Sequence, residues 1–247
     1  MGQLDGQVAI VTGAGSGVGR AAALALAGEG AVVALAGRRE EPLRETATLV
    51  TSLPDVDANR ALVTPCDVTV PEQVRDMVAR VLARFGRIDV LVNNAGLNVP
   101  RRALAEMEPA DWRRIVTVNL EGPYLCVHAV LPTMREQGSG TFIHIGSKAA
   151  WRPSPLAGAA YTAAKAGLAG LSAAINAEER VNGLRSAVII LGDVNTPLLD
   201  ERPTPPSAET RAHLLDPRDV AACVRLIATL PPRARIEELV LLSSYIG

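Results

Sequence analysis

The stretch TGAGSGVGRAAALALAGEG, residues 12–30, follows a short apolar run and precedes a series of small, helix-forming residues. Its glycines Gly13, Gly17 and Gly19 are spaced GxxxGxG, which differs from the common GxGxxG turn because Val18 stands where the last glycine would fall. Glycines allow a sharp turn and a close approach of the backbone to a pyrophosphate, whose charge is stabilised by free N–H groups at a helix start. We predict a strand, a dinucleotide-binding turn and a helix here, with a plain strand-to-helix connection as the alternative.

Further apolar runs alternate with longer segments of helical pattern along the whole chain. Each run is nearly continuous in apolar residues, as in a parallel strand covered on both faces, and the intervening segments are long enough for crossover helices. We predict one doubly wound α/β domain over residues 1–247, with a seven-stranded parallel sheet flanked by helices. The predicted strands are 8–11, 31–37, 60–64, 89–93, 141–145, 186–190 and 239–243.

One segment interrupts this alternation. Residues 195–217 contain five prolines and no clean period, so we expect a loop or a pair of short helices. An insertion of this length in a compact domain is typical of a functional lid, and we assign it to the substrate side. A disordered surface excursion is the alternative.

Composition restricts the partners and the surroundings of the chain. With 25 basic and 26 acidic residues the net charge is -1, which gives no overall field for nucleic acid or an anionic membrane. Cys66, Cys126 and Cys223 are far apart and show no metal-ligand spacing, as expected for buried thiols in a reducing compartment. We find no signal peptide and no apolar stretch of about 18 residues, so we predict a soluble cytoplasmic protein without a metal site.

The end of the second predicted strand indicates which dinucleotide is bound. An NAD-binding chain carries Asp or Glu there for the ribose 2′-hydroxyl, whereas a 2′-phosphate needs a nearby arginine. This strand ends in Gly37, Arg38 and Arg39, so Arg38 favours NADP. The alternative is that Arg38 and Arg39 form a solvated helix start with Glu40 and Glu41.

Two other strand ends carry residues suited to a cofactor wall. Asp67 and Val68 follow the third strand, where a carboxylate would accept a hydrogen bond from an adenine amino group. The sequence NNAG at 93–96 follows the fourth strand. Each pattern also fits a loop-capping aspartate or an ordinary turn.

The pair Tyr161 and Lys165 lies four positions apart in a run of small residues, so both side chains share one helix face. Lowering the pKa of a tyrosine from about 10 to about 7 requires roughly 4 kcal/mol. A unit charge ~4 Å away at an effective dielectric of ~20 supplies about that much, so we predict Tyr161 as the acid/base and Lys165 as the group that lowers its pKa. A chance spacing is the alternative.

Ser147 and Asn119 complete the predicted catalytic group. Ser147 follows the fifth strand and would orient the substrate oxygen, while Asn119, in the helix after the fourth strand, would hold a water beside Lys165. The plainer alternatives are a strand cap for Ser147 and a backbone hydrogen bond for Asn119.

In the order TGxxxGxG at 12–19, NNAG at 93–96, Asn119, Ser147 and YxxxK at 161–165, the chain resembles the short-chain dehydrogenase/reductase family over nearly its whole length. The resemblance implies a Rossmann sheet, a nicotinamide cofactor, a catalytic tetrad of these four residues, and contact of the lysine with the nicotinamide ribose. It also favours a helix-mediated homodimer or homotetramer, for which the small residues around the tyrosine would allow close packing. Tight packing within the subunit explains these small residues equally well.

Two positions depart from the pattern of the family. The usual Pro-Gly pair after the sixth strand is replaced by Leu191 and Gly192, and Ser16 stands where NADP-preferring members often have a basic residue. We assign to the cofactor Gly13, Ser16, Gly17, Val18, Gly19, Arg38, Asp67, Val68, Asn94, Ala95, Gly96, Tyr161, Lys165, Gly192, Val194 and Thr196.

Some polar residues are given lesser roles. We interpret His128 and His144 as satisfied core histidines, whereas His213 would be within reach of a substrate. Trp151 and Arg152 are assigned to the pocket wall or to loop packing. A solvated helix face is preferred to an anion-attracting role for Arg101, Arg102, Arg113 and Arg114.

We therefore predict an NADP-preferring oxidoreductase that interconverts a small secondary alcohol and a ketone, with no nucleic-acid or membrane partner. One alternative is an NAD-dependent dehydrogenase of a cyclic alcohol or dihydrodiol. A second, from another class, is a nucleotide-binding regulator that has kept the fold and lost turnover.

Overall fold

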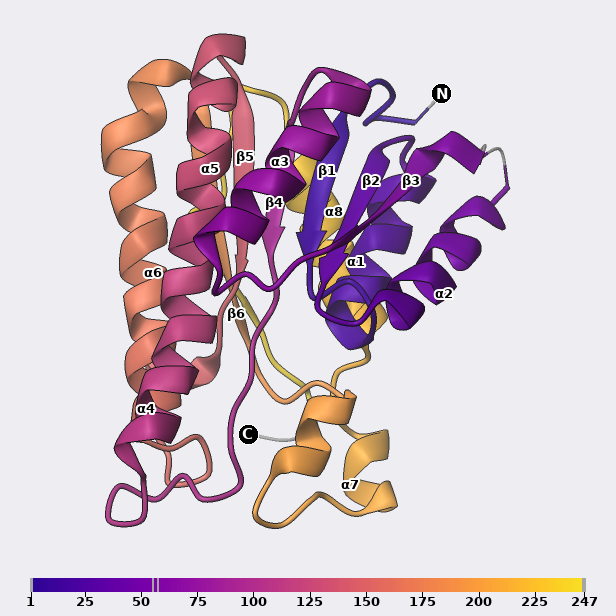
Figure 1. The fold of residues 1–247 in the computed structure, drawn as a ribbon. Helices are drawn as coiled ribbons and strands as arrows, with labels where there is room; N and C mark the ends of the chain where they lie inside the picture. Colours follow the sequence, from indigo (N-terminus) through magenta and orange to yellow (C-terminus); the bar gives the residue numbers. More distant parts are fainter. Residues whose placement is uncertain (1, 55, 57, 246–247) are drawn as a thin grey trace.

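A computed structural model of the chain describes residues 2–54, 56 and 58–245. Its strands are all parallel and form one seven-stranded sheet in the order β3-β2-β1-β4-β5-β6-β7 (Figure 1). Each strand lies within about two residues of its predicted position, so the predicted fold class is confirmed. The strands are β1 (Val8–Thr12), β2 (Val32–Gly37), β3 (Ala61–Pro65), β4 (Val90–Asn93), β5 (Gly140–Ile145), β6 (Leu184–Leu191) and β7 (Glu238–Leu241).

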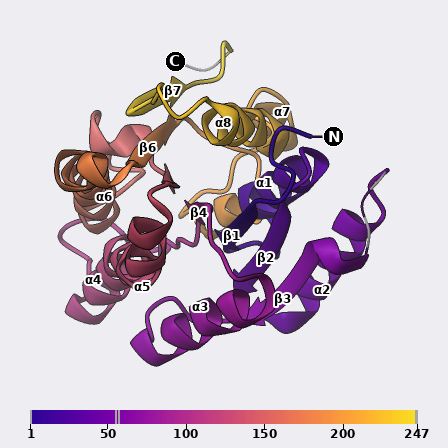
Figure 2. The same cartoon turned by 90° about the horizontal axis from the view of Figure 1, so that it is seen from above.

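Helices cover both faces of the sheet. Seen from above, α1 and α8 lie on one side and α3 and α5 on the other (Figure 2). Each side encloses its own hydrophobic core, one packed on α1, α2 and α8 and the other on α3, α5 and α6. The helices are α1 (Gly17–Gly28), α2 (Glu40–Thr51), α3 (Pro71–Phe85), α4 (Pro109–Val116), α5 (Gly122–Gln137), α6 (Ala159–Glu179), α7 (Ala208–Ala212) and α8 (Pro217–Thr229).

Helix boundaries follow local chemistry. Helix α3 has Pro71 in its first turn and ends at Gly86, whose φ of 73° favours glycine. Helix α8 begins with a capping box, in which the Asp216 and Asp219 side chains accept hydrogen bonds from each other's backbone N–H groups. These signals set where α3 begins and ends and where α8 begins.

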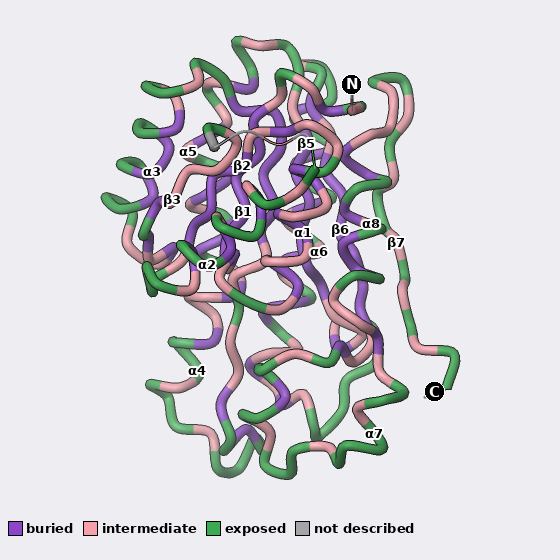
Figure 3. The backbone as a smooth tube through the Cα atoms, turned by 90° about the vertical axis from the view of Figure 1, so that its right-hand side faces the viewer, coloured by how far each residue is buried: buried purple, intermediate pink, exposed green. Residues whose placement is uncertain are grey.

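The expected burial on both faces holds for the inner strands but not for the edges. Every residue of β1 and β4 is buried, whereas β7 alternates between exposed and half-buried residues. Figure 3 shows this change in burial between the inner strands and β7. The reason is position, because β7 pairs with β6 alone and lies at the edge of both helix layers.

Residues 195–217 fold as a pair of short helices, as expected: a 3₁₀ turn at Pro197–Glu201 and α7. The ends of the segment are joined by a parallel bridge between Val194 and Leu215, and the Asn195 N–H donates to Leu215 O at 2.8 Å. The segment lies beyond the carboxyl ends of the strands, at the bottom of Figure 1. The sheet order reverses between β1 and β4, so a ligand-binding crevice opens at the same end.

Candidate active site

A cleft of about 880 Å³ lies at the carboxyl ends of the strands. All the site residues predicted from the sequence line it except Gly19. Gly19 lies in the first turn of α1, where a Cβ would be 2.2 Å from Gly13 O and 2.5 Å from Asn94 Nδ2. Gly19 is therefore needed for close packing beneath the turn, which makes it a supporting residue and not a lining one.

The glycine turn has the geometry of a cradle for a phosphate group. Gly13 and Gly17 have φ values of 66° and 51°, in the left-handed region that favours glycine. Ser16 precedes α1 and makes no side-chain cap hydrogen bond, so its side chain leaves the N–H groups of the first turn open. Such a turn fits the pyrophosphate of a dinucleotide.

The end of β4 holds this turn in place. The Thr12 hydroxyl accepts hydrogen bonds from the N–H groups of Asn94 and Ala95, each at 3.0 Å. The Asn94 side chain donates to Thr12 O at 2.9 Å and to Gly13 O at 3.3 Å. Asn94, Ala95 and Gly96 therefore line the cleft, and the first two also fix the glycine turn.

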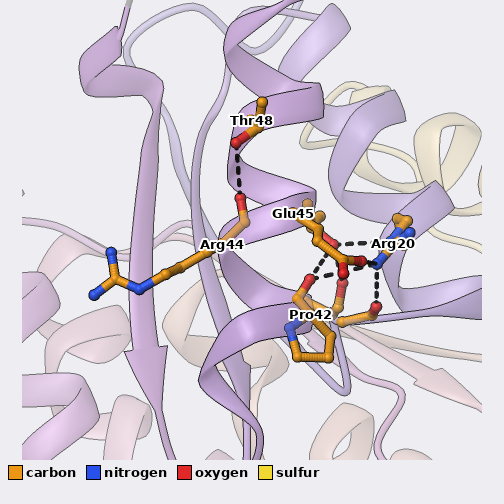
Figure 4. A network of polar contacts seen from close by, with 8 residues as sticks. Arg20, Pro42, Arg44, Glu45 and Thr48 are labelled. Carbon is orange, nitrogen blue, oxygen red and sulfur yellow. Dashed lines mark hydrogen bonds and ion pairs between the residues drawn. The ribbon is translucent and has the colours of Figure 1, made fainter.

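Arg20 fixes the turn from the other side (Figure 4). Its guanidinium donates to Gly15 O at 2.6 Å and pairs with Glu45 of α2 at 2.7 Å. Thr46 accepts from Arg20 Nε at 3.0 Å and donates to Ala14 O at 2.9 Å. The network joins the turn to α2, which begins directly after Arg38 and Arg39.

The two arginines at the end of β2 are exposed and line the cleft. Glu40 pairs with Arg44 of the next helical turn, and Arg38 and Arg39 form no ion pair with any described residue. The alternative interpretation, a solvated helix start formed with Glu40 and Glu41, also fits, because all four side chains are exposed and α2 begins at Glu40 with Arg39 as its N-cap. Both charges remain available to a bound anion.

Asp67 caps its own loop, which is the alternative role that the sequence left open. Its carboxylate accepts hydrogen bonds from the Thr69 N–H at 3.0 Å and the Thr69 hydroxyl at 2.7 Å. The residue also lines the cleft, so loop capping and a cofactor contact are compatible.

Tyr161 and Lys165 lie on one face of α6, with the Lys165 Nζ 5.6 Å from the centre of the phenol ring. Lys165 is buried and donates to Ile145 O at 2.8 Å. Burial lowers the pKa of Lys165 to about 8. The ammonium is therefore held at a fixed position between the end of β5 and the tyrosine.

The predicted lowering of the Tyr161 pKa by Lys165 is not found in this structure. Burial raises the pKa of the phenol, because an ionised oxygen loses its hydration there. The Ser147 side chain, within hydrogen-bonding reach, opposes this shift and lowers the pKa, as do the charges of Arg102 and Arg202. The attraction between Tyr161 and Lys165 alone would lower the pKa of the phenol, but both groups are buried, and the cost of desolvating the phenolate is larger.

Asn119 lies in a π-helical turn, Thr117–Glu121, of a kind that often marks functional sites. Its side-chain amide donates to Leu97 O at 2.8 Å and to Ile115 O at 2.9 Å. A Cβ at Gly96 would be 2.8 Å from Asn119 Oδ1 and 3.8 Å from Lys165 Nζ. The structure thus brings asparagine and lysine together around Gly96.

One arginine was assigned wrongly from the sequence. Arg101, Arg113 and Arg114 are exposed as expected, but Arg102 is only 5% exposed and lines the cleft. The loops around it supply three carbonyl acceptors, which no local pattern reveals. Sequence reasoning also missed Lys148, adjacent to Ser147, and Arg202, within residues 195–217, both of which line the cleft beside Trp151 and Arg152.

The histidines also differ from expectation. His128 is exposed and faces the Tyr124 ring at 5.8 Å. His144 is fully buried, but its Nε2 makes no hydrogen bond with the described residues, and burial lowers its pKa to about 3. His213 packs against Tyr245 at 5.1 Å and is not among the described residues that line the cleft.

No group of three or more His, Cys, Asp or Glu side chains in the described part of the chain is placed to hold a metal ion. None of the helices described is both long and apolar enough to cross a membrane.

A parallel sheet with a glycine turn at its switch point and a Tyr–Lys pair in the same cleft defines a nicotinamide-dependent oxidoreductase. The family model for short chain dehydrogenases matches residues 7–206. A short chain dehydrogenase/reductase of Aspergillus oryzae, astE, is 40% identical over 196 residues, which are 79% of this chain and 74% of the relative.

Solved structures agree with this match. A metagenomic short-chain oxidoreductase in complex with NADP has a TM-score of 0.83 at 34% identity, covering 97% of each chain. An alcohol dehydrogenase from the archaeon Thermococcus sibiricus, complexed with 5-hydroxy-NADP, has a TM-score of 0.86 at 31% identity, covering 98% of each chain. The chain belongs to the short-chain dehydrogenase/reductase family and is an enzyme that acts on CH–OH groups.

Proposed function

We propose that the enzyme prefers NADP(H) and interconverts a secondary alcohol and a ketone, with Tyr161 as the acid/base. The observation that carries the cofactor preference is the end of β2, where two unpaired arginines stand and an acidic residue is missing. Arginine binds a 2′-phosphate, whereas a carboxylate at this point would repel it. Two structural neighbours were solved with NADP or a derivative of it, in line with this preference.

The residues of the cleft fit such a cofactor from end to end. In this proposal the glycine turn holds the pyrophosphate, Asp67 and Val68 contact the adenine, and Lys165 contacts the nicotinamide ribose. Gly192, Val194 and Thr196 line the nicotinamide end. When bound, the dinucleotide supplies the hydride in reduction and accepts it in oxidation.

The chain's own residues hold and move the proton. In reduction, Tyr161 gives its hydroxyl proton to the substrate oxygen, while the Ser147 hydroxyl donates a hydrogen bond that orients that oxygen. The Lys165 ammonium stabilises the phenolate that results. Asn119, fixed by its bonds to Leu97 and Ile115, would position a water through which the proton is replaced.

The wider organisation is part of the same proposal. The chain acts as one domain in which residues 195–217 form a lid over the substrate, and copies associate through α6 as a dimer or tetramer. Part of the small-residue pattern on α6 is already used within the subunit, because a Cβ at Gly167 would be 2.8 Å from the Leu120 side chain. A cytoplasmic location stays a prediction that depends on cysteine usage.

Parallel titrations of Arg38→Asp with NADPH and NADH test the cofactor preference. Loss of a charge-assisted contact should weaken NADPH by about 10- to 100-fold, with a much smaller effect on NADH. Arg44→Asp is the matched control, since Arg44 is exposed on α2 and lies outside the cleft. Equal losses for both nucleotides in Arg38→Asp would refute the assignment.

Tyr161→Phe tests the acid/base. Turnover of a ketone panel should be abolished while the NADPH affinity, measured by fluorescence, stays within about twofold, because the phenol contributes a proton and little binding. A variant that retains the full rate would dismiss the phenol from this role. If the wild-type chain binds NADPH and consumes none with any ketone, the regulator alternative is correct.

A further inference from the structure

Positively charged side chains outnumber carboxylates among the described residues that line the cleft. Carboxylates among the described lining residues are Asp67, near the end of β3, and Asp193, which is paired with Arg202 at 2.7 Å. Apart from Arg38 and Arg39 at the end of β2 and Lys165 on α6, the cationic side chains that line the cleft are Arg102, Lys148, Arg152 and Arg202. The part of the cleft that these four residues line, which we call the substrate half, carries an excess of positive charge.

Arg102 is the most buried of these cations. Its guanidinium donates to Val99 O at 2.6 Å, to Leu156 O at 3.1 Å and to Glu201 O at 2.5 Å. Val99 lies in the same loop as Arg102, whereas Leu156 and Glu201 belong to two other segments, of which the second is residues 195–217. Arg102 thus joins the loops that surround the substrate half.

These bonds do not neutralise Arg102. A guanidinium has five N–H donors, and the bonds to the three carbonyls leave two of them for another acceptor. Arg102 makes no ion pair with any described carboxylate, and a buried charge without a counter-ion is costly. The site therefore favours an anion that arrives with the substrate.

The charges of Arg102 and Arg202 also act on the phenol of Tyr161. The Tyr161 phenol lies within the field of both arginines: Asp193 raises the pKa of the phenol, and the positive charges of Arg102 and Arg202 lower it. Lys148 and Arg152, which form no ion pair with the described residues, add to the field at the cleft.

We propose that the substrate is a hydroxy acid or keto acid whose carboxylate is bound by Arg102, with Arg202 beside it. The planar fork of an arginine matches a carboxylate with two parallel hydrogen bonds. The inference rests on the proposed alcohol–ketone function and adds the class of substrate. The carboxylate only binds, and the bond changes are those of the alcohol and ketone.

The experiment compares keto acids with their own methyl esters. Dissociation constants are measured by calorimetry for 2-oxobutanoate, 4-oxopentanoate and 5-oxohexanoate, and for the three esters, on enzyme saturated with NADP⁺. Oxidised nucleotide cannot reduce a ketone, so the measurement reports binding without turnover. At least one acid should bind about 10- to 100-fold more tightly than its ester, and added salt should reduce that preference.

Variants of Arg102 test whether this residue binds the carboxylate of the acid. Arg102→Met should remove most of the preference of the acid over the ester, and Arg102→Lys should restore only part of it, since lysine keeps the charge without the fork. Arg101→Met is the matched control, because Arg101 is exposed, pairs with Glu108 and lies outside the cleft. Thermal unfolding checks that each variant is folded, and if Arg102→Met is not, Arg202→Met and Arg152→Met provide the test.

The proposal is overturned if no acid binds better than its ester, or if the Arg102 variants weaken acid and ester alike. A failure of the proposed function would look different. Hydride transfer would then be missing with acids, esters and simple ketones for both nucleotides, whatever the ratio of the dissociation constants.

Discussion

Replacing Gly19 by alanine tests the packing beneath the dinucleotide turn. The new Cβ would be 2.2 Å from Gly13 O, 2.7 Å from Gly13 C and 2.5 Å from Asn94 Nδ2, whereas ordinary contact begins at 3.4 Å. Neither neighbour can rotate away, because the first is backbone and the Asn94 amide is held by Thr12 O. The turn must therefore move by about 1 Å relative to α1.

The size of the effect follows from this displacement. Overpacking of a close contact costs about 1–3 kcal/mol, and we expect a loss of about 2 kcal/mol in the free energy of unfolding. For a chain of this length the unfolding midpoint should fall by about 4–8 °C. The NADPH dissociation constant should rise at least about tenfold, because the N–H groups of the turn lose their alignment.

The same helix provides a matched control. Gly28 is the last residue of α1, and a Cβ there would meet nothing within 4 Å. Gly28→Ala should leave the affinity unchanged and stabilise the fold by up to about 1 kcal/mol. Urea unfolding and NADPH fluorescence titration measure both quantities. A Gly19→Ala variant as stable and as tightly binding as Gly28→Ala would refute the reasoning.

Two other predictions concern α6. Since burial lowers the pKa of Lys165 to about 8 and raises that of Tyr161, the lysine charge is present below that pH and lost above it, while the phenol stays protonated. The kcat/KM for NADPH, which reports the free enzyme, should therefore be level at lower pH and fall as the pH rises through about 8. Asn176→Leu should lower the free energy of unfolding in urea by about 2–4 kcal/mol, because the Ser186 N–H and C=O in β6 lose their buried partner.

Contrary results are simple to recognise. A pH profile that stays level well above the lysine pKa would show that the ammonium is not needed for nucleotide binding. An Asn176→Leu variant with wild-type stability would show that the Ser186 backbone finds other partners or water. The pH profile is measured at constant ionic strength, and Asn176→Leu is compared with the wild type in the same buffer.

Much of the fold was readable from the sequence, since its signals are local. Near-continuous apolar runs predicted all seven strands, and the glycine turn after β1 predicted the start of α1. The order of strand ends then predicted which side chains meet, because carboxyl ends of parallel strands share one edge. This is why Ser147, Tyr161 and Asn94, remote in sequence, were correctly placed in one cleft.

Burial and partners at the level of single atoms were decided only by the tertiary structure. Arg102 has the same local sequence context as the exposed Arg101, yet it is buried. The distant carbonyls of Leu156 and Glu201 converge on its guanidinium together with that of the nearby Val99. The pKa of Tyr161 depends likewise on desolvation by the surrounding chain, which a spacing of four residues does not encode. Periodicity and turn chemistry act between neighbours in sequence and so set the elements, whereas solvation and charge depend on what packs around each group.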